Sequence, residues 1–324
     1  MKLLRNLVLA AAVLLAACSP KAEQARPAAG APTVIRFATD WKAQAELGGF
    51  YQAQASGEYA RRGLDVRILQ GGPGVNVPQL MAAGAVDMGV GSNAYIVANL
   101  AQEGAPVKAV AAFMQKNPQV LIAHPDTGVE TVADLRGHPI LLSDASVSTV
   151  WAWMKARYGF TDDQVRKYAF SSAPFLADRR AAQQGYVTSE PYTIEKQTKV
   201  KPKVFLMADE GMAGYATLAL ATDSLIARNP AAVRAFVEAS AKGWRDYLNG
   251  DASAADALIM KDNPEMTQDV LDQARAKLKA YRIVEGDKGQ PLGAMTDTDW
   301  KAFFHAGVAL ALYPKTLDPR KAYT

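Results

Sequence analysis

Short apolar runs typical of strands alternate with longer segments of helical periodicity, and this alternation is the strongest constraint on the fold. Such a pattern favours parallel sheets that are covered by helices. The runs fall into two series, each long enough for one small α/β lobe. The first series comprises the expected strands Val34–Ala38, Leu64–Leu69, Val86–Val90, Val107–Phe113 and, in the same layer, Val120–Ala123. The second comprises Pro139–Leu142, Lys167–Ser171, Gly185–Thr188 and Val204–Met207, and is followed by Thr217–Ala221 and then helices only.

The N-terminus has the features of a lipoprotein signal peptide over residues 1–17. Lys2 and Arg5 precede an apolar stretch that is too short for a permanent membrane span, which needs about 20 residues. The ending LAAC at 15–18 resembles the bacterial lipobox, which implies that Cys18 becomes the lipid-modified first residue. Because Cys18 is the single cysteine, no internal disulfide is possible. Residues 18–33 are rich in Ala, Pro and polar groups and predict a flexible tether.

Charge and length restrict the rest of the chain. Removing Lys2 and Arg5 from the 36 basic residues leaves 34 against 32 acidic residues, a net charge near +2 without a basic stripe. Nucleic-acid binding is therefore not indicated. About 290 residues follow the tether in a chain that is 49% hydrophobic, which is enough for two cores. No later segment approaches 18 uninterrupted apolar residues, so we expect the remainder to be soluble.

Two helix starts are marked in the C-terminal part. Asn229-Pro230 combines a capping side chain with proline at the first helical position, and Trp244 then lies on the apolar face and is expected in the core. Thr296 and Asp299 resemble a variant capping box for a last helix. Its apolar face would carry Trp300, Phe303, Phe304 and Val308.

Five motifs across residues 34–222 resemble one known family, the bacterial periplasmic solute-binding proteins of ABC importers, in the group for nitrate, sulfonates and thiamine-pyrimidine precursors. The motifs are Asp40-Trp41, GGFYQAQASGEYARRGLDVRI at 48–68, GAVDMGVGSNAYIV at 84–97, TVADLRGHPI at 131–140 and QQGYVTSEPYTIEK at 183–196.

The resemblance implies an α/β, periplasmic-binding-protein type II fold with the solute enclosed between two lobes. Lobe I would comprise residues 34–124 and 211–324, and lobe II residues 125–210, with chain crossings near Ala123–Asp126 and Ala208–Tyr215. The closed form would be presented to an ABC permease and its ATPase. We expect a monomer in the periplasm or cell envelope, held at the membrane by its lipid anchor.

Ligands in open α/β sheets bind beyond the carboxyl ends of the strands. After the first strand, Asp40 would accept hydrogen bonds from a ring N–H, and Trp41 would either stack on a flat ring or cap the lobe core. Phe50 and Tyr51 are adjacent in the next expected helix. Successive helical residues point in directions about 100° apart, so only one of the two side chains can face the cleft directly. We expect Tyr51 to face it and Phe50 to be core.

Two further stretches of lobe I follow strands. The glycines within 71–74 allow a tight turn and a close approach to a solute, or form a plain turn, and Asn76 would add a side-chain amide. Ser92 and Asn93 precede a helix whose free N–H groups favour an acceptor or an anion, unless the two residues merely cap it.

Asp144, Ser146, Tyr186 and Glu190 are the candidates from lobe II, whereas Trp151 is expected in the core. Glu190 follows a strand, and its alternative role is that of a solvated loop carboxylate. The resemblance supports Glu190, because the pyrimidine-binding members use an acidic residue in this region. It also supports stacking by Trp41, because those members have an aromatic residue near that position.

Asp40 and Glu190 facing each other would suit a neutral or cationic heterocycle rich in hydrogen-bond donors, and would repel a sulfonate or nitrate. Lys42 and Lys116 are nearby cations that reverse this preference if they point inward. The leading expectation is therefore a thiamine pyrimidine precursor resembling hydroxymethylpyrimidine. Another heterocycle such as a flavin or purine, or a small sulfonate or nitrate, is the alternative.

Catalysis is not expected, and neither a cofactor nor a metal site is predicted. A eukaryotic branch of the family makes the thiamine pyrimidine with its own histidine and iron, which is the enzyme alternative. Here His124 and His138 precede prolines, and His305 lies on a C-terminal helix. None matches a cleft motif, and the GxSxG, P-loop and dinucleotide motifs are absent from the sequence. An anchored sensory protein is a third possibility.

Overall fold

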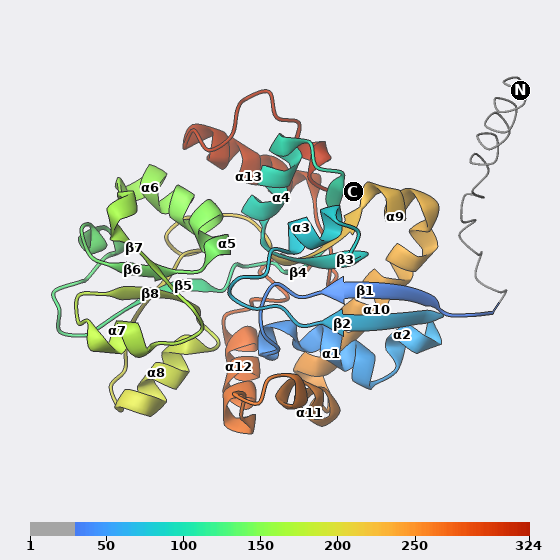
Figure 1. The fold of residues 1–324 in the computed structure, drawn as a ribbon, viewed down its shortest axis with the longest axis horizontal. Coiled ribbons are helices and arrows are strands. Elements are labelled where there is room, and N and C mark those ends of the chain that lie inside the picture. The colour runs from blue at the N-terminus through green and yellow to red at the C-terminus, as the bar shows by residue number, and fades with distance from the viewer. Residues whose placement is uncertain (1–29) are drawn as a thin grey trace, which may run out of the picture. The chain divides into compact units, whose positions relative to one another are not determined.

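The computed structural model describes residues 30–324, so the signal peptide, Cys18 and most of the tether lie outside the described residues. The strands form two five-stranded sheets, which Figure 1 shows on the right and on the left. The first sheet has the order β2-β1-β3-β10-β4, with β1 (Thr33–Ala38), β2 (Leu64–Leu69), β3 (Met88–Asn93), β4 (Val107–Met114) and β10 (Ala216–Thr222). The second has the order β7-β6-β8-β5-β9, with β5 (Gln119–Ala123), β6 (Ile140–Leu142), β7 (Val165–Lys167), β8 (Ala182–Tyr186) and β9 (Lys203–Leu206).

Helices cover both sheets, and the predicted α/β architecture with two lobes is confirmed. Around the first sheet lie α1 (Gly48–Ala55), α2 (Glu58–Arg61), α3 (Val77–Ala82), α4 (Ala94–Glu103), α9 (Asp223–Arg228), α10 (Pro230–Asn249), α11 (Ser253–Asp262), α12 (Gln268–Ala280) and α13 (Asp297–Ala309). Around the second lie α5 (Asp144–Ser146), the π-helical turn η3 (Val147–Trp151), α6 (Ala152–Tyr158), α7 (Ala173–Ala177) and α8 (Glu190–Thr198). Among the described residues, no helix has the length and hydropathy that a membrane crossing requires.

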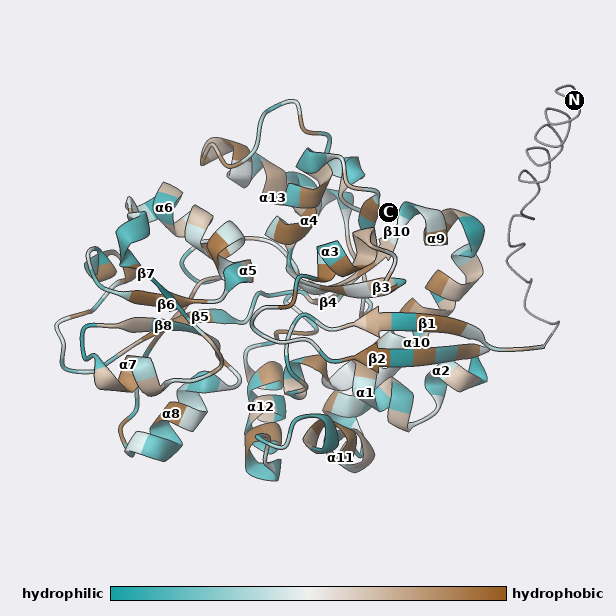
Figure 2. Cartoon of the chain, viewed as in Figure 1, coloured by the Kyte–Doolittle hydropathy of each residue, from teal (hydrophilic) through white to brown (hydrophobic). Residues whose placement is uncertain are grey.

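The strands follow the alternation in the sequence. In β1, Ile35 and Phe37 are completely buried, while Val34 is exposed and Arg36 forms a two-pronged ion pair with Asp87. Figure 2 shows the corresponding brown and teal segments along β1 and β2. β1 runs parallel to β2 and β3, whereas β10 is antiparallel to both β3 and β4. The carboxyl ends of β1 and β3 therefore meet at the edge that faces the second sheet.

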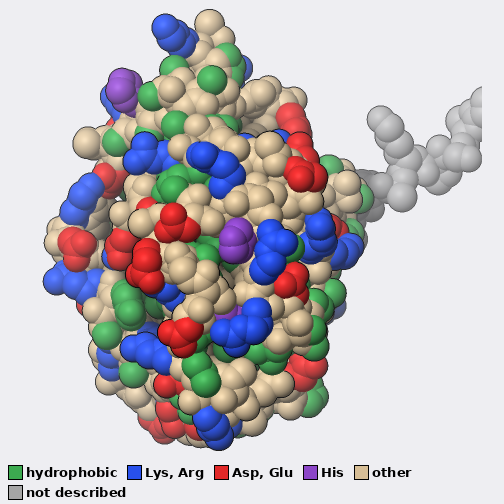
Figure 3. Space-filling view, turned by 90° about the vertical axis from the view of Figure 1, so that its left-hand side faces the viewer, with side chains coloured by type: hydrophobic (Ala, Val, Ile, Leu, Met, Phe, Trp, Pro, Cys, Tyr) green, Lys and Arg blue, Asp and Glu red, His purple; other side chains and the backbone are tan. Residues whose placement is uncertain are grey.

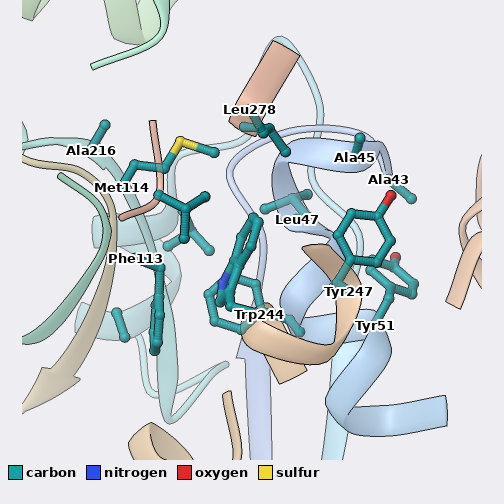
Figure 4. Close-up of a cluster of buried hydrophobic side chains, with 14 of the residues drawn as sticks. Ala43, Ala45, Leu47, Tyr51, Phe113, Met114, Ala216, Trp244, Tyr247 and Leu278 are labelled. Atoms are coloured by element: carbon teal, nitrogen blue, oxygen red, sulfur yellow. The ribbon is translucent and has the colours of Figure 1, made fainter. Parts of the chain in front are cut away.

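The packing of α1 against α10 explains the glycine pair at 48–49. A Cβ on Gly49 would lie 2.1 Å from the ring of Trp244, so only glycine permits this separation between the two helices. Figure 4 shows Trp244 and Tyr247 in this buried cluster, and Trp244 is in the core as predicted. α10 begins as predicted, because the backbone N–H of Ala232 donates to the side chain of Asn229 at 3.1 Å.

The start of α13 also agrees with the prediction. The side chain of Thr296 accepts a hydrogen bond from the N–H of Asp299 at 3.1 Å, which caps the first turn. Trp300, Phe303 and Phe304 are buried behind this cap, against the face of the first sheet opposite α1.

Two strand predictions are wrong. The segment 120–123 does not continue the first layer: β5 lies in the second sheet between β8 and β9. Because β4 belongs to the first sheet and β5 to the second, we propose that the first crossing lies at 115–118, where Pro118 has no N–H for a ladder. The segment 167–171 is not a strand, because β7 ends at Lys167 after pairing with β6.

The second crossing lies between β9 and β10, in the interval 207–215. From the sheets, we propose that lobe I comprises residues 33–114 and 216–324, and that lobe II comprises residues 119–206.

Candidate functional site

A cavity of about 50 Å³ lies between the two lobes. Its lobe I wall is built from the loops that follow β1 and β2 and from the end of β3, and its lobe II wall from the end of β8 and the helix starts that follow β6 and β8. Seven of the predicted site residues line it: Asp40, Trp41, Ser92, Asn93, Ser146, Tyr186 and Glu190.

Hydrogen bonds within lobe I position Asp40 and Trp41. The hydroxyl of Thr39 donates to the carbonyl of Trp41 at 2.8 Å and accepts from the N–H of Gly71 at 3.0 Å. A Cβ on Gly71 would lie 2.1 Å from the carbonyl oxygen of Thr39. The glycine-rich turn therefore lets the end of β2 pack against the end of β1, and Gly72 and its neighbour Pro73 then reach the cavity.

Trp41 belongs to lobe I, and its ring packs against two aromatic rings of lobe II. Its ring is stacked on that of Tyr168, with centroids 6.1 Å apart and an angle of 11° between the planes, and it meets the ring of Phe170 edge-on. Neither Tyr168 nor Phe170 lines the cavity, whereas Trp41 does. Part of the indole is therefore packed against lobe II, and part remains available to a ring in the cavity.

At the end of β3, Asn93 caps α4. Its side-chain oxygen accepts from the N–H of Tyr95 at 3.1 Å, and the N–H of Ala94 donates to the carbonyl of Tyr215 at 2.9 Å. Two of the first N–H groups of this helix thus have partners within the protein. This arrangement weakens the expectation that the start of α4 attracts an anion.

In lobe II, Glu190 joins the end of β8 to the start of α8. One carboxylate oxygen accepts from the N–H of Tyr186 at 2.8 Å and from the hydroxyl of Ser189 at 2.5 Å. The other accepts from the hydroxyl of Tyr168 at 3.2 Å. Glu190 is 9% exposed, so it is not the solvated loop carboxylate of the alternative interpretation.

Glu46 is a cavity residue that the sequence prediction missed. It is 2% exposed and comes from the short helical turn η1 (Ala45–Leu47). One carboxylate oxygen accepts from the hydroxyl of Thr188 in lobe II, and the other is buried without a hydrogen-bond partner. Burial raises the pKa of Glu46 to about 7, and the charge of Glu190 adds to this effect. The sequence feature that could have identified Glu46 as a site residue is its isolation as a single carboxylate among the mostly small and apolar residues at 43–50.

Asp40, Glu46 and Glu190 place three carboxyl groups on one cavity. Burial raises the pKa of Asp40, and a hydrogen bond from the side chain of Ser92 partly opposes this shift. Burial also raises the pKa of Tyr186 well above its usual value, and all three carboxylates raise it further.

No Lys or Arg lines this cavity in the part of the chain that the structure describes. Lys42 pairs with Glu265 at 2.6 Å and lies 4.0 Å from the ring of Phe170. Lys116 pairs with Asp209 at 2.7 Å. Neither cation therefore reverses the preference against an anion. Figure 3 shows that basic and acidic side chains are interspersed on the outer face of lobe II.

Three predicted residues lie outside the cavity. Tyr51 is 2% exposed, and its hydroxyl donates to Asp262 at 2.9 Å; Figure 4 shows it beside Tyr247 in the buried cluster. The prediction for Tyr51 is wrong because α10 and α11 bury this face of α1 as well as the face of Phe50. Asn76 caps α3, and Asp144 pairs with Lys167 at 3.3 Å; both line a chamber beside the cavity.

Other lining residues were also missed. The buried amide of Gln184 accepts from the N–H of Ser143 at 2.6 Å, and Gln119 donates weakly to Ser146 at 3.4 Å. Thr217, at the chain crossing, has a φ of 44°, which is strained for a β-branched residue. The remaining polar members of the lining that were missed are Gln44 and Thr149.

Comparison with known proteins places this geometry in a family. The profile described as "NMT1/THI5 like" matches residues 44–254. The riboflavin-binding protein RibY of Chloroflexus aurantiacus is 29% identical over 263 residues, which is 75% of this chain and 74% of RibY.

Two solved structures share the fold. One is a protein of Bordetella bronchiseptica, with a TM-score of 0.70 and 19% identity over 90% of this chain and 94% of that one. The other is the alkanesulfonate-binding protein SsuA of Xanthomonas axonopodis bound to MOPS, with a TM-score of 0.66 and 14% identity over 90% and 99%. The family match covers most of the chain and the fold agrees with that of the solved structures, so the protein belongs to the NMT1/THI5-like family.

Proposed function

We propose that this protein is the solute-binding component of an ABC-type importer and that it carries a flat nitrogen heterocycle without altering it. The observation that carries the proposal is the cavity lining, which combines three carboxyl groups, one indole ring and several neutral amides and hydroxyls. Such a lining suits a ring that donates N–H or O–H hydrogen bonds. We favour riboflavin, the ligand for which the relative RibY is named.

Electrostatics argues against a sulfonate or nitrate. An anion in the cavity would meet Asp40, Glu46 and Glu190 at short range, and each of these groups repels it when ionised, while no Lys or Arg of the described residues lines the cavity to offset them. Repulsion between like charges is strong where water is largely excluded. A ligand N–H that donates to Glu46 would instead satisfy its unpartnered buried oxygen.

A ring enters this cavity only if the lobes separate. The volume of about 50 Å³ is small beside the roughly 300–1,000 Å³ of typical small-molecule sites. The contacts between the lobes include the stack of Trp41 on Tyr168 and the hydrogen bond from Thr188 to Glu46. We infer a hinged opening that frees Trp41 from Tyr168, followed by closure around the solute.

Riboflavin and a thiamine pyrimidine precursor make different demands on the lining. Riboflavin carries a ribityl chain with four hydroxyls in addition to its tricyclic ring, and the buried amides of Gln119 and Gln184 with the hydroxyl of Ser146 offer partners for the polar atoms of that ring. A pyrimidine precursor would use fewer of these groups. It is our second candidate, because its amino group would donate to the unpartnered oxygen of Glu46.

The positions of the histidines support binding rather than the thiamine-pyrimidine synthase alternative. The ring of His124 bonds the carbonyl of Phe175 at 2.8 Å, and that of His138 bonds the carbonyl of Arg180 at 2.7 Å. His305 is exposed on α13. None of the three lines the cavity, so we propose no catalytic residue and no cofactor.

We further propose that the protein works outside the cytoplasmic membrane as a lipid-anchored monomer, with a permease and its ATPase as partners. The proposal rests on the family and on the lipobox at 15–18. Wild-type protein should fractionate with membranes, and Cys18→Ser protein should be released from them after export. A Cys18→Ser protein that stays with the membrane would contradict the anchor.

Calorimetric titration of the exported Cys18→Ser protein tests the solute. The probes are riboflavin, hydroxymethylpyrimidine and an alkanesulfonate. We expect saturable binding of riboflavin with a Kd of about 1 μM or lower, and no binding heat with the sulfonate. Binding of the pyrimidine alone would favour the second candidate. Binding of the sulfonate alone would refute the heterocycle proposal.

A further inference from the structure

A second chamber of about 430 Å³ adjoins the cavity. The two share Asp40, Val75, Ser92 and Ala145 in their linings, so they meet at the wall between the end of β3 and the start of α5. The chamber extends from this wall between α3 and α4 of lobe I and α5 of lobe II. A molecule in the inner cavity could therefore extend a substituent into this chamber.

The lining of the chamber mixes apolar side chains, such as Ile96 and Leu100, with polar side chains that are neutral or acidic. Asn76, Asn99 and Ser148 contribute neutral groups, and Glu103 and Asp144 contribute carboxylates, in addition to the shared Asp40. Asn99 on α4 donates to the carbonyl of Ser148 at 3.1 Å and so joins the two lobes at this wall. Among the described residues, no Lys or Arg lines the chamber. Lys167 reaches only Asp144, at 3.3 Å, and both of these side chains are exposed.

We propose that this chamber is a subsite for the substituent of the solute, and that it accepts an uncharged polyhydroxyl chain and rejects a phosphorylated one. The inference rests on the proposed function, in which a flat ring occupies the inner cavity beside Trp41. A substituent on that ring would pass between Asp40 and Ala145, and its hydroxyls would meet amides, hydroxyls and carboxylates, all of which accept hydrogen bonds.

A phosphate in the same place would be unfavourable. It would carry a charge of about −1.5 to −2 into a space bordered by Asp40, Glu103 and Asp144. Within the described part of the chain, Lys167 is the one cation at ion-pair distance from these carboxylates, and Asp144 already pairs with it. The chamber therefore discriminates riboflavin from its phosphate by charge, while its volume accommodates both.

Three probes separate the ring from its substituent. Lumichrome has the tricyclic ring without the ribityl chain, riboflavin has both, and flavin mononucleotide adds the phosphate. In calorimetric titrations of the Cys18→Ser protein we expect lumichrome to bind at least about tenfold more weakly than riboflavin, because it lacks the hydrogen bonds of the chain. We expect flavin mononucleotide to bind at least about tenfold more weakly as well.

Charge removal in the chamber tests the second half of the proposal. In the variant Glu103→Gln/Asp144→Asn, the ratio of the two Kd values, flavin mononucleotide over riboflavin, should fall several-fold. Glu238→Gln removes one carboxylate from an exposed position on α10 and should leave that ratio unchanged. An unchanged ratio in the double variant would refute discrimination by these carboxylates.

The outcomes distinguish this proposal from the proposed function. Equal affinity for lumichrome and riboflavin would refute the subsite while leaving the heterocycle assignment intact. Equal affinity for riboflavin and its phosphate would refute the rejection of charge. Absence of binding by every flat heterocycle in the panel would overturn the proposed function and, with it, the subsite.

Discussion

Trp41 is the side chain on which ring recognition depends in this proposal. Its stack on Tyr168 holds the indole at the border of the cavity. We expect Trp41→Ala to weaken riboflavin binding by about 1–3 kcal/mol, because both stacking and apolar contact area are lost. Trp41→Phe keeps a ring and should lose less. Calorimetry on the two variants measures the difference, and an unchanged Kd in Trp41→Ala would remove Trp41 from the site.

Glu46 makes the stability of the unliganded protein depend on pH. Its pKa is about 7 in the folded protein against an ordinary value of 4.5, so the folded state retains a proton that the unfolded chain has lost. Stability contributed by Glu46 is therefore complete below about pH 4.5 and falls as the pH rises to 7. The loss is on the order of 3 kcal/mol.

Glu46→Gln should remove much of this dependence. The variant should melt at a higher temperature than wild type at pH 8, and the two should converge near pH 4. Asp40 also has a raised pKa, and it faces the same cavity with Tyr186 and Glu190, so part of the pH dependence will persist. Melting curves of Glu238→Gln across the same range provide the control. Parallel curves for Glu46→Gln and wild type would contradict the assignment.

Strand ends were the informative part of the sequence for the site. Asp40, Ser92 and Tyr186 were predicted because polar or aromatic residues follow strands there, and all three line the cavity. Tyr51 was misassigned and Glu46 was missed for a common reason: the rotation of a short helix is set by the elements that pack against it, which the sequence does not reveal. Here α10 and α11 bury Tyr51, and Glu46 on the preceding turn reaches the cavity.

The approach of α1 to α10 predicts a second effect on stability. In Gly49→Ala the added methyl group would overlap the ring of Trp244, which is completely buried and has little freedom to move. We expect a loss of about 1–3 kcal/mol in the free energy of unfolding. Chemical denaturation measures it.

Gly74→Ala is the matched control. A Cβ at Gly74 meets no atom within 4 Å, and the residue does not have a positive φ. Its stability should stay within about 0.5 kcal/mol of wild type, or rise slightly, because alanine restricts the unfolded chain. If both variants were equally stable, the close packing of α1 on α10 would be disproved.

The hydrophobic pattern of the sequence identified most strands, but it did not show which strands pair with one another. β5 has an apolar run like those of the first sheet, and only its pairing with β8 and β9 assigns it to the second. β7 is three residues long and largely exposed, so it carries almost no alternation by which its register could be recognised. The helix starts at Asn229 and Thr296 were predicted more reliably than the strand pairing, because a helix cap depends only on residues that are close together in the chain.

Across the whole molecule, contacts between α8 and α12 join the two lobes, and we expect them to stabilise the closed form. Asp269 on α12 accepts from the hydroxyl of Tyr192 at 2.9 Å and from the ammonium group of Lys196 at 2.7 Å, both on α8. Figure 1 shows these helices on either side of the gap between the lobes. Asp269→Asn should weaken this connection, because it removes the negative charge that pairs with Lys196. Riboflavin should then dissociate several-fold faster in stopped-flow measurements.

Asp297 offers a control with the same chemistry inside lobe I. It accepts from the hydroxyl of Tyr323 at 2.7 Å and from Arg320 at 2.6 Å. Asp297→Asn should lower the melting temperature slightly and leave the dissociation rate of riboflavin unchanged. Equal dissociation rates in the Asp269 and Asp297 variants would show that the contact between α8 and α12 does not hold the closed form.

The placement of β10 has a consequence for biosynthesis. This strand fills the middle of the first sheet, between β3 and β4, yet it is made only after all of lobe II. A growing chain that has not reached residue 222 has no ladder partner for the facing edges of β3 and β4. Lobe II is continuous in the sequence and lacks this dependence, so it can fold first. A chain threaded through a membrane from its N-terminus therefore keeps its first hundred residues unfinished until the last third arrives.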